Sequence, residues 1–182
     1  MPTLAQEFKD LESPFVVLML VKAASYMSSD LAAMSLFSKD SSKSGIYVSV
    51  NKPYEDIKKL LDKNKISTKR LFFVDMISKE IDSEKEEKEN CFYIPSPTSL
   101  TDLGIVLEET ANMMPGKKYL VLDTLSTLLV YNSLGTVEKF AHFITTKIRG
   151  WDMDGVIISL EKETSESLKS QLAQFCDKII ST

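Results

Sequence analysis

The chain has 182 residues, enough for one domain whose buried core needs neither disulfides nor a metal ion. Hydrophobic residues make up 43% and charged residues 26% of the sequence, which is ordinary for a globular protein, and the net charge of −4 argues against a nucleic-acid partner. The two cysteines form no CxxC pair of the kind that binds zinc or carries redox chemistry, so we expect no metal site.

The longest apolar run, residues 15–21, is much shorter than the roughly 20 residues that a membrane-spanning helix needs. The chain also begins without a basic leader or a small-residue cleavage site. We therefore expect a cytoplasmic protein with no membrane insertion.

In the first half of the chain, short apolar runs alternate with segments of helical period. The run from Pro14 to Val21 predicts a strand that is buried on both faces. Residues 79–90 are dominated by charged side chains, so they are predicted to be a charged surface loop or a frayed helix, with a docking segment as the alternative. The other predicted elements of this half are helices at 28–37 and 53–62 and strands at 45–50 and 70–75.

The second half continues the same alternation. Its predicted elements are an extended piece at 91–94, helices at 99–114, 125–131, 136–149 and 166–176, and strands at 118–123, 155–160 and 178–181. Strands that alternate with helices favour parallel pairing through right-handed crossovers. We expect residues 1–182 to form a single domain, a three-layer α/β/α sandwich with a mainly parallel central sheet. Residues 1–13 would be an N-terminal extension that either docks on the domain or reaches a neighbour.

Ligands of open parallel sheets bind at the carboxyl ends of the strands. One apolar strand ends in Asp123 and is followed by Thr124, Leu125 and Ser126, a pattern similar to a Walker B strand, whose carboxylate orients magnesium beside nucleotide phosphates. The alternative role for Asp123 is structural, because a carboxylate at a strand end can cap a helix or bond neighbouring hydroxyls.

Other motifs occur in an order that resembles the KaiC-like branch of the RecA superfamily of ATPases. Tyr47–Val50 followed by Pro53 is similar to the second strand of that family, and Asp123–Ser126 is similar to its Walker B segment. Gly155–Ser159 and Asp177–Ile180 resemble the two closing strands. The similarity runs from about residue 14 to the C-terminus and implies a RecA-like P-loop NTPase fold.

The phosphate-binding loop of that family has no counterpart here. Such loops use glycines so that backbone N–H groups can wrap the phosphates, and a lysine reaches the terminal phosphates. The corresponding stretch, residues 21–30, contains no glycine. Ser28 stands in place of the lysine, Ser29 could keep the magnesium-binding hydroxyl, and Asp30 adds negative charge. The side chains of Tyr26 and Met27 restrict the loop conformation.

A second departure concerns the catalytic base. The family places two acidic residues after its second strand, whereas Asn51 and Lys52 follow here. Neither an amide nor an ammonium group can act as a general base at neutral pH. We therefore expect no ATP hydrolysis, no enzyme activity and no required cofactor.

The resulting hypothesis is an inactive ATPase homologue that acts as a regulatory or adaptor domain. Its partner would be a protein, either a second copy in a homo-oligomer or a RecA-like relative, and the resemblance implies an archaeal-type signalling role. The alternative is a sensor that binds a nucleotide or another small ligand without turnover. The vestigial site would be lined by Ser28, Ser29, Lys52, Asp123 and Ser126.

A third hypothesis, an unrelated enzyme, has little support in the sequence. The single histidine, His142, lies in a helical segment, and no nucleophile motif accompanies it. We expect His142 to be a partly buried structural residue.

Overall fold

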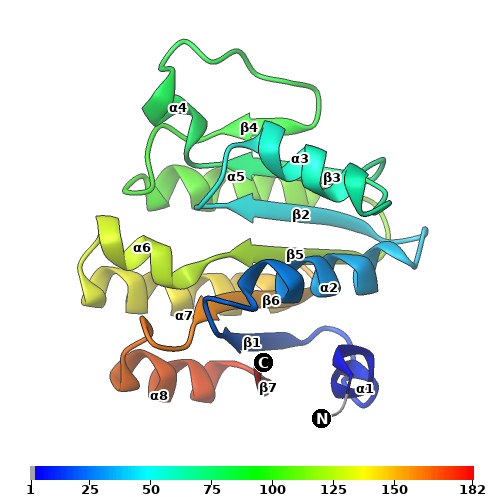
Figure 1. Ribbon diagram of the computed structural model, residues 1–182, viewed down its shortest axis with the longest axis vertical. Helices are drawn as coiled ribbons and strands as arrows, with labels where there is room; N and C mark the ends of the chain where they lie inside the picture. Colours follow the sequence, from blue (N-terminus) through cyan, green and yellow to red (C-terminus); the bar gives the residue numbers. More distant parts are fainter. Residues whose placement is uncertain (1–2) are drawn as a thin grey trace.

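The computed structural model describes residues 3–182. In these residues seven strands form one sheet in the order β4-β3-β2-β5-β6-β1-β7, and every pairing between neighbouring strands is parallel (Figure 1). The strands are β1 (Val16–Val21), β2 (Ser44–Ser49), β3 (Leu71–Asp75), β4 (Cys91–Tyr93), β5 (Lys118–Asp123), β6 (Met153–Leu160) and β7 (Lys178–Ser181).

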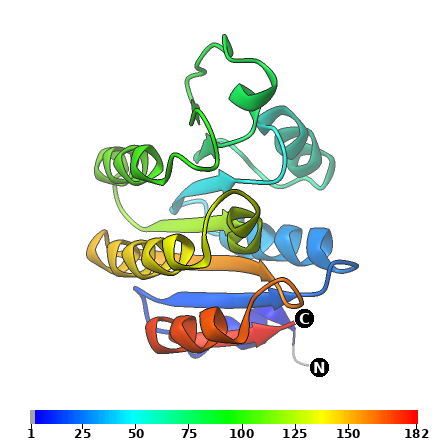
Figure 2. The same ribbon diagram turned by 90° about the vertical axis from the view of Figure 1, so that its left-hand side faces the viewer.

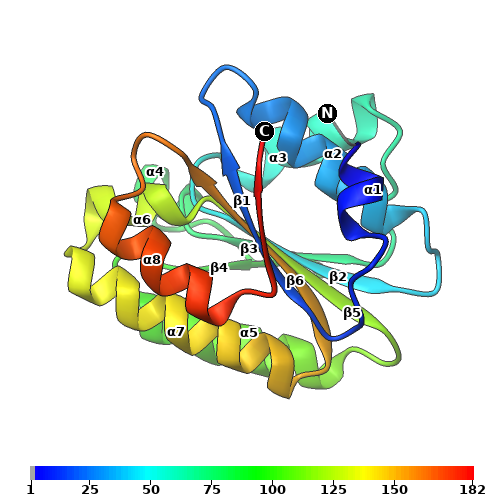
Figure 3. The same ribbon diagram turned by 90° about the horizontal axis from the view of Figure 1, so that it is seen from below.

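Helices cover both faces of the sheet, which confirms the three-layer α/β/α sandwich. Figure 3 shows α1, α2 and α3 on one face and α5, α7 and α8 on the other. The helices are α1 (Leu4–Phe8), α2 (Tyr26–Ser38), α3 (Tyr54–Lys63), α4 (Ser78–Ile81), α5 (Leu100–Met113), α6 (Leu125–Tyr131), α7 (Leu134–Gly150) and α8 (Glu166–Phe175).

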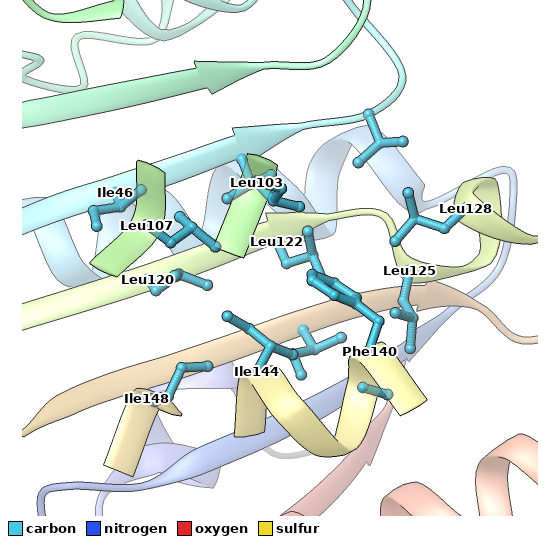
Figure 4. Close-up of a cluster of buried hydrophobic side chains, with 14 of the residues drawn as sticks. Ile46, Leu103, Leu107, Leu120, Leu122, Leu125, Leu128, Phe140, Ile144 and Ile148 are labelled. Atoms are coloured by element: carbon cyan, nitrogen blue, oxygen red, sulfur yellow. The ribbon is translucent and has the colours of Figure 1, made fainter. Parts of the chain in front are cut away.

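The apolar strands are buried because their side chains pack into two hydrophobic cores, one on each face of the sheet. Alternate residues of a strand point to opposite faces, so Val16 and Leu18 of β1 join the core under α5–α8, while Val17 and Met19 join the core under α1–α3. Figure 4 shows the first core, where Leu120 and Leu122 meet side chains of α5 and α7. Burial on both faces explains why the sequence shows continuous apolar runs.

The N-terminal segment docks on the domain. Phe8 of α1 is buried and makes edge contacts with the rings of Phe15 and Phe37, at centroid distances of 5.6 and 6.1 Å. The side chain of Lys178 pairs with Glu7 at 2.6 Å. Residues 1 and 2 of the predicted extension lie outside the described residues.

The charged segment projects beyond the rest of the molecule at the β4 edge of the sheet (Figure 1). Its first residues form the short helix α4, and most residues from Asp82 to Glu89 are exposed. Lys88 bonds to Glu55 of α3, and Ser96 donates to Glu80 at 2.8 Å. These contacts attach both ends of the segment to the domain.

Two predicted boundaries differ from the observed ones for local reasons. Helix α2 begins at Tyr26, two residues before the predicted start, because Ser29 N–H already donates to the carbonyl of Ser25. Helix α7 begins at Leu134, because the Ser133 side chain caps it by accepting from Thr136 N–H at 3.2 Å.

Candidate functional site

The strands β1, β2 and β5 all end at the same edge of the sheet (Figure 1). Asp123 is the last residue of β5, is fully buried, and lies beside Ser49 of β2 in the strand register. The peptide bond between Asp123 and Thr124 is cis. Helix α2, which follows β1, brings its first residue, Tyr26, to this point. The topology therefore gathers residues far apart in sequence around one buried carboxylate.

Two phenols surround that carboxylate. The hydroxyl of Tyr26 lies 2.5 and 2.6 Å from the two carboxylate oxygens of Asp123, and the hydroxyl of Tyr47 donates to Oδ2 of Asp123 at 2.8 Å. Hydrogen bonds to an ionised acceptor are shorter and stronger than neutral ones. Burial, and next the charge of Asp123, raise the pKa of the Tyr26 phenol, so this group remains protonated and donates.

A second buried carboxyl lies behind Tyr47. This carboxyl belongs to Asp30, whose Oδ2 lies 3.0 Å from the phenol oxygen of Tyr47. Oδ1 of Asp30 has no hydrogen-bond partner within residues 3–182. Burial, followed by the charge of Asp123, raises the pKa of Asp30 well above its ordinary value. A phenol has a single proton, so it cannot serve both carboxyl groups as a full donor.

The arrangement is satisfied when Asp30 is protonated and donates to Tyr47, which in turn donates to Asp123. Burial raises the pKa of Asp123 as well, but the hydrogen bonds from Tyr26 and Tyr47 and the charge of Lys52 oppose that shift. The negative charge of the cluster therefore resides on Asp123. We call Tyr26, Asp30, Tyr47 and Asp123 the tyrosine–aspartate cluster.

Asn51 lies over the cluster on its outer side. Its amide nitrogen is 3.2 Å from the Tyr26 hydroxyl and 3.3 Å from Oγ1 of Thr124, and its amide oxygen accepts from Thr127 at 2.5 Å. These contacts use both ends of the amide. The position that the family resemblance assigns to an acidic residue is thus occupied by a side chain that links β2, α2 and the start of α6.

The five residues predicted to line one site do not share one set of contacts. Lys52 is half-buried and close enough to Asp123 to lower its pKa. Ser126 is buried and accepts from the N–H of Leu160 at 3.0 Å. Ser28 is exposed and donates to the carbonyl of Ser25 at 2.8 Å, whereas Ser29 is buried against Thr182, 2.9 Å away.

Sequence reasoning did not include Tyr47 in the site, although it noted Tyr26 and Asp30. The missing signal was the register of β2 against β5, because a residue two positions before the strand end faces Asp123 only when Ser49 and Asp123 are paired. The prediction for His142 was wrong in its burial. His142 lies on the exposed side of α7, where its ring is 4.6 Å from that of Phe175.

A cavity of about 300 Å³ lies where β1 and β6 end. It is lined by residues 21–24 and 160–163, which include two lysines, Lys22 and Lys162, and two glutamates, Glu161 and Glu163. The wall from residue 21 to 24 is the first part of the stretch that corresponds to a phosphate-binding loop. Asp123 does not line this cavity.

Two negative findings apply to residues 3–182. No three side chains of histidine, cysteine, aspartate or glutamate are grouped there so that they could share a metal ion. None of the helices combines the length and the apolar character that crossing a membrane requires.

The fold is shared with solved structures of low sequence identity. A KaiC-like protein from Pyrococcus horikoshii matches with a TM-score of 0.68 and 8% identity over 94% of this chain and 72% of that one. An uncharacterized protein from the same archaeon, solved in complex with an unknown peptide, matches with a TM-score of 0.69 and 12% identity. The match covers 98% of this chain and 81% of that one. The flagellar accessory protein FlaH from Methanocaldococcus jannaschii matches with a TM-score of 0.62 and 12% identity, over 94% of this chain and 72% of that one.

These likenesses confirm the RecA-like, KaiC-like fold that the order of motifs predicted. No curated protein sequence matches the chain at a significant level. The sequence profile of one family covers residues 17–182, which is nearly the whole chain. The chain therefore belongs to the family of unknown function DUF7504.

Proposed function

We propose that this chain is a non-catalytic, RecA-like regulatory or adaptor domain that acts through protein–protein association and does not hydrolyse ATP. One observation carries the proposal: the hydroxyl of Tyr26 bonds to both carboxylate oxygens of Asp123. In a Walker B strand that carboxylate orients magnesium. Here a side chain from the adjacent helix engages it.

The residues present do not fit a magnesium nucleotide. The connection from Lys22 to Ser25 between β1 and α2 has no glycine, so it lacks the residue type that lets consecutive N–H groups wrap a phosphate. Ser29 bonds to Thr182 and Asn51 bonds to Thr124 and Thr127. Neither supplies a carboxylate that could activate water.

The partner in this proposal is a second copy of the chain or a RecA-like relative. Two of the similar structures accord with a binding role, since one is an accessory protein and another was solved with a peptide. Fold similarity does not transfer function by itself. The support from this chain is that it keeps the RecA-like fold while the carboxylate at the Walker B position is hydrogen-bonded internally.

A second candidate is a sensor that binds a nucleotide or another small ligand without turnover. The cavity of about 300 Å³ beside residues 21–24 favours it, because the cavity lies at the carboxyl ends of β1 and β6, where ligands of parallel sheets bind. Its lining residues include Lys22 and Lys162, together with Glu161 and Glu163. A ligand there would lie at the ends of β1 and β6 and would leave the bond between Tyr26 and Asp123 in place.

Isothermal titration calorimetry with ATP and with ADP, each with and without magnesium, separates the two candidates when light scattering gives the mass in parallel. The adaptor predicts no heat up to millimolar nucleotide and a defined assembly. Heat at micromolar nucleotide that is lost in Lys22→Ala/Lys162→Ala would establish the sensor. Heat that is lost in Asp123→Ala would contradict the internal role of Asp123.

A further inference from the structure

Four large apolar side chains are exposed at the edge of the molecule where the strands end. They are Ile81 of α4, Val130 and Tyr131 at the end of α6, and Leu134 at the start of α7, and their exposed fractions are 73%, 77%, 38% and 39%. Figure 2 looks onto this edge and shows the charged segment above the turn that joins α6 to α7. We call these four residues the apolar edge surface.

Hydrogen bonds connect the two parts of this surface. Ser96 donates to Glu80, next to Ile81, at 2.8 Å. One residue further along the chain, the carbonyl of Pro97 accepts from the side chain of Asn132 at 3.1 Å. Asn132 also donates to the carbonyl of Leu128 in α6. The segment from Ser96 to Pro97 therefore holds α4 and the α6–α7 turn in a fixed relation.

The rim of the surface is acidic on the side of α4. Residues 82–89 contain carboxylates at positions 82, 84, 86, 87 and 89 but lysines only at 85 and 88. Lys88 is bonded to Glu55, which removes it as a free counter-charge. Charge of one sign beside an apolar surface selects a partner of the opposite sign and speeds its association.

We propose that the apolar edge surface docks an amphipathic, basic helix of a partner protein, with its apolar face on Val130, Tyr131 and Leu134 and its lysines or arginines toward residues 82–89. This inference rests on the proposed adaptor function and names the chemistry of the partner. A helix of about 14 residues is about 21 Å long and presents apolar anchors at positions i, i+3 or i+4, and i+7 along one face.

The groove between α5 and α7 is less suited to such a partner. It is the larger hollow, at about 420 Å³, and Ile105 and Phe143 line it. Glu108 on one wall pairs with Lys147 at 2.9 Å, so Lys139 on the other wall leaves the groove with a net positive charge. The groove therefore gives no preference for a basic helix and supplies a control position.

A fluorescein-labelled peptide of 14 residues, with leucines at helical spacing and lysines elsewhere, tests the proposal by fluorescence anisotropy against the full chain. We expect micromolar binding that weakens at least tenfold in Val130→Asp/Leu134→Asp. Both side chains are exposed, so the variant should retain the thermal unfolding midpoint of the unmodified chain. The matched control is Ile105→Asp, an exposed apolar position in the groove, which should change the affinity less than twofold.

A second set of variants tests the role of the acidic residues 82–89. Reversal of charge in Glu84→Lys/Glu86→Lys/Glu87→Lys should weaken binding of the lysine peptide and reduce its dependence on salt. A peptide with glutamates in place of the lysines should not bind the unmodified chain. Equal binding of both peptides, or equal loss in Ile105→Asp and Val130→Asp/Leu134→Asp, would overturn the proposal.

A second copy of the chain is the competing occupant. If Val130→Asp/Leu134→Asp turned an assembly into monomers in light scattering and left peptide affinity unchanged, the basic partner would be excluded. Hydrolysis of ATP by the unmodified chain would instead refute the non-catalytic function, whether or not the peptide binds. The two failures are therefore distinguishable.

Discussion

The hydroxyl of Tyr26 lies within 2.6 Å of both carboxylate oxygens of Asp123, so the first residue of α2 is bonded to the last residue of β5. In P-loop NTPases, the phosphate loop before the corresponding helix and the aspartate of the Walker B strand both hold magnesium. At the carboxyl edge of the sheet, the stability of the fold and the proposed loss of nucleotide chemistry therefore depend on the same side chains.

Removal of the Tyr26 hydroxyl should destabilise the fold. In Tyr26→Phe the ring remains, but Asp123 loses a donor while it stays buried, which costs about 1.5–3 kcal/mol for a hydrogen bond to a charged group. Urea unfolding at neutral pH measures the difference. Tyr131→Phe, at an exposed tyrosine, is the control and should leave the free energy of unfolding unchanged within about 0.5 kcal/mol.

The tyrosine–aspartate cluster should make stability fall as pH rises. Burial raises the pKa of Asp30 in the folded protein above its value of about 4 in the unfolded chain. The folded state therefore holds a proton that the unfolded state has released, so the free energy of unfolding falls from about pH 4 upward until Asp30 ionises. The pKa of Asp123 is also raised by burial and acts in the same direction.

Asp30→Asn should remove the Asp30 part of this dependence. The amide resembles the protonated acid and can still donate to Tyr47, so the variant should equal or exceed the unmodified chain in stability at neutral pH. Urea unfolding at pH 5 and pH 8 gives the slope. Asp102→Asn on the exposed side of α5 should retain the full slope, and a retained slope in Asp30→Asn would contradict the protonated state of Asp30.

Two glycines should respond oppositely to alanine. A Cβ at Gly45 would overlap the ring of Tyr119, which is buried and stacked on Phe37 at 4.6 Å, so Gly45→Ala should cost about 1–3 kcal/mol. Nothing lies within 4 Å of a Cβ at Gly135 in α7, so Gly135→Ala should stabilise by about 0.5–1 kcal/mol. Thermal unfolding of both variants checks the opposite signs.

Lys43 should contribute more to the free energy of unfolding than the surface lysines do. Its ammonium group pairs at 2.7 Å with Oδ2 of Asp154, and Oδ1 of Asp154 has no hydrogen-bond partner within residues 3–182. Lys43→Met would leave this buried carboxylate unpaired and should cost about 2–3 kcal/mol, less than a fully buried pair because Lys43 is partly exposed. Lys58→Met breaks an exposed pair with Asp62 and should cost less than about 0.5 kcal/mol in the same urea titration.

The sequence was sufficient for the architecture because burial on both faces leaves continuous apolar runs such as Val16–Val21. It also located Asp123, because an apolar run that ends in aspartate is similar to a Walker B strand. The start of α2 was harder to predict, because the phosphate-loop resemblance places Tyr26 in a loop, whereas the bond from Ser29 N–H to the carbonyl of Ser25 starts the helix there.

The contacts within the site could not be read from the sequence because they depend on register and on the meeting of distant segments. Tyr47 reaches Asp123 only through the pairing of β2 with β5, and Ser29 meets Thr182, the last residue of the chain. The family resemblance had grouped Ser29 with Asp123, because Ser29 stands at the position of the magnesium-binding hydroxyl. The structure shows that Ser29 instead bonds at the end of β7.

The release of phosphate from millimolar ATP with magnesium, measured with the unmodified chain and with Asp123→Ala, tests the central claim most directly. The non-catalytic account predicts that neither protein releases phosphate above the rate of the protein-free blank. Release by the unmodified chain that Asp123→Ala abolishes would show that Asp123 still serves nucleotide chemistry and would contradict the account.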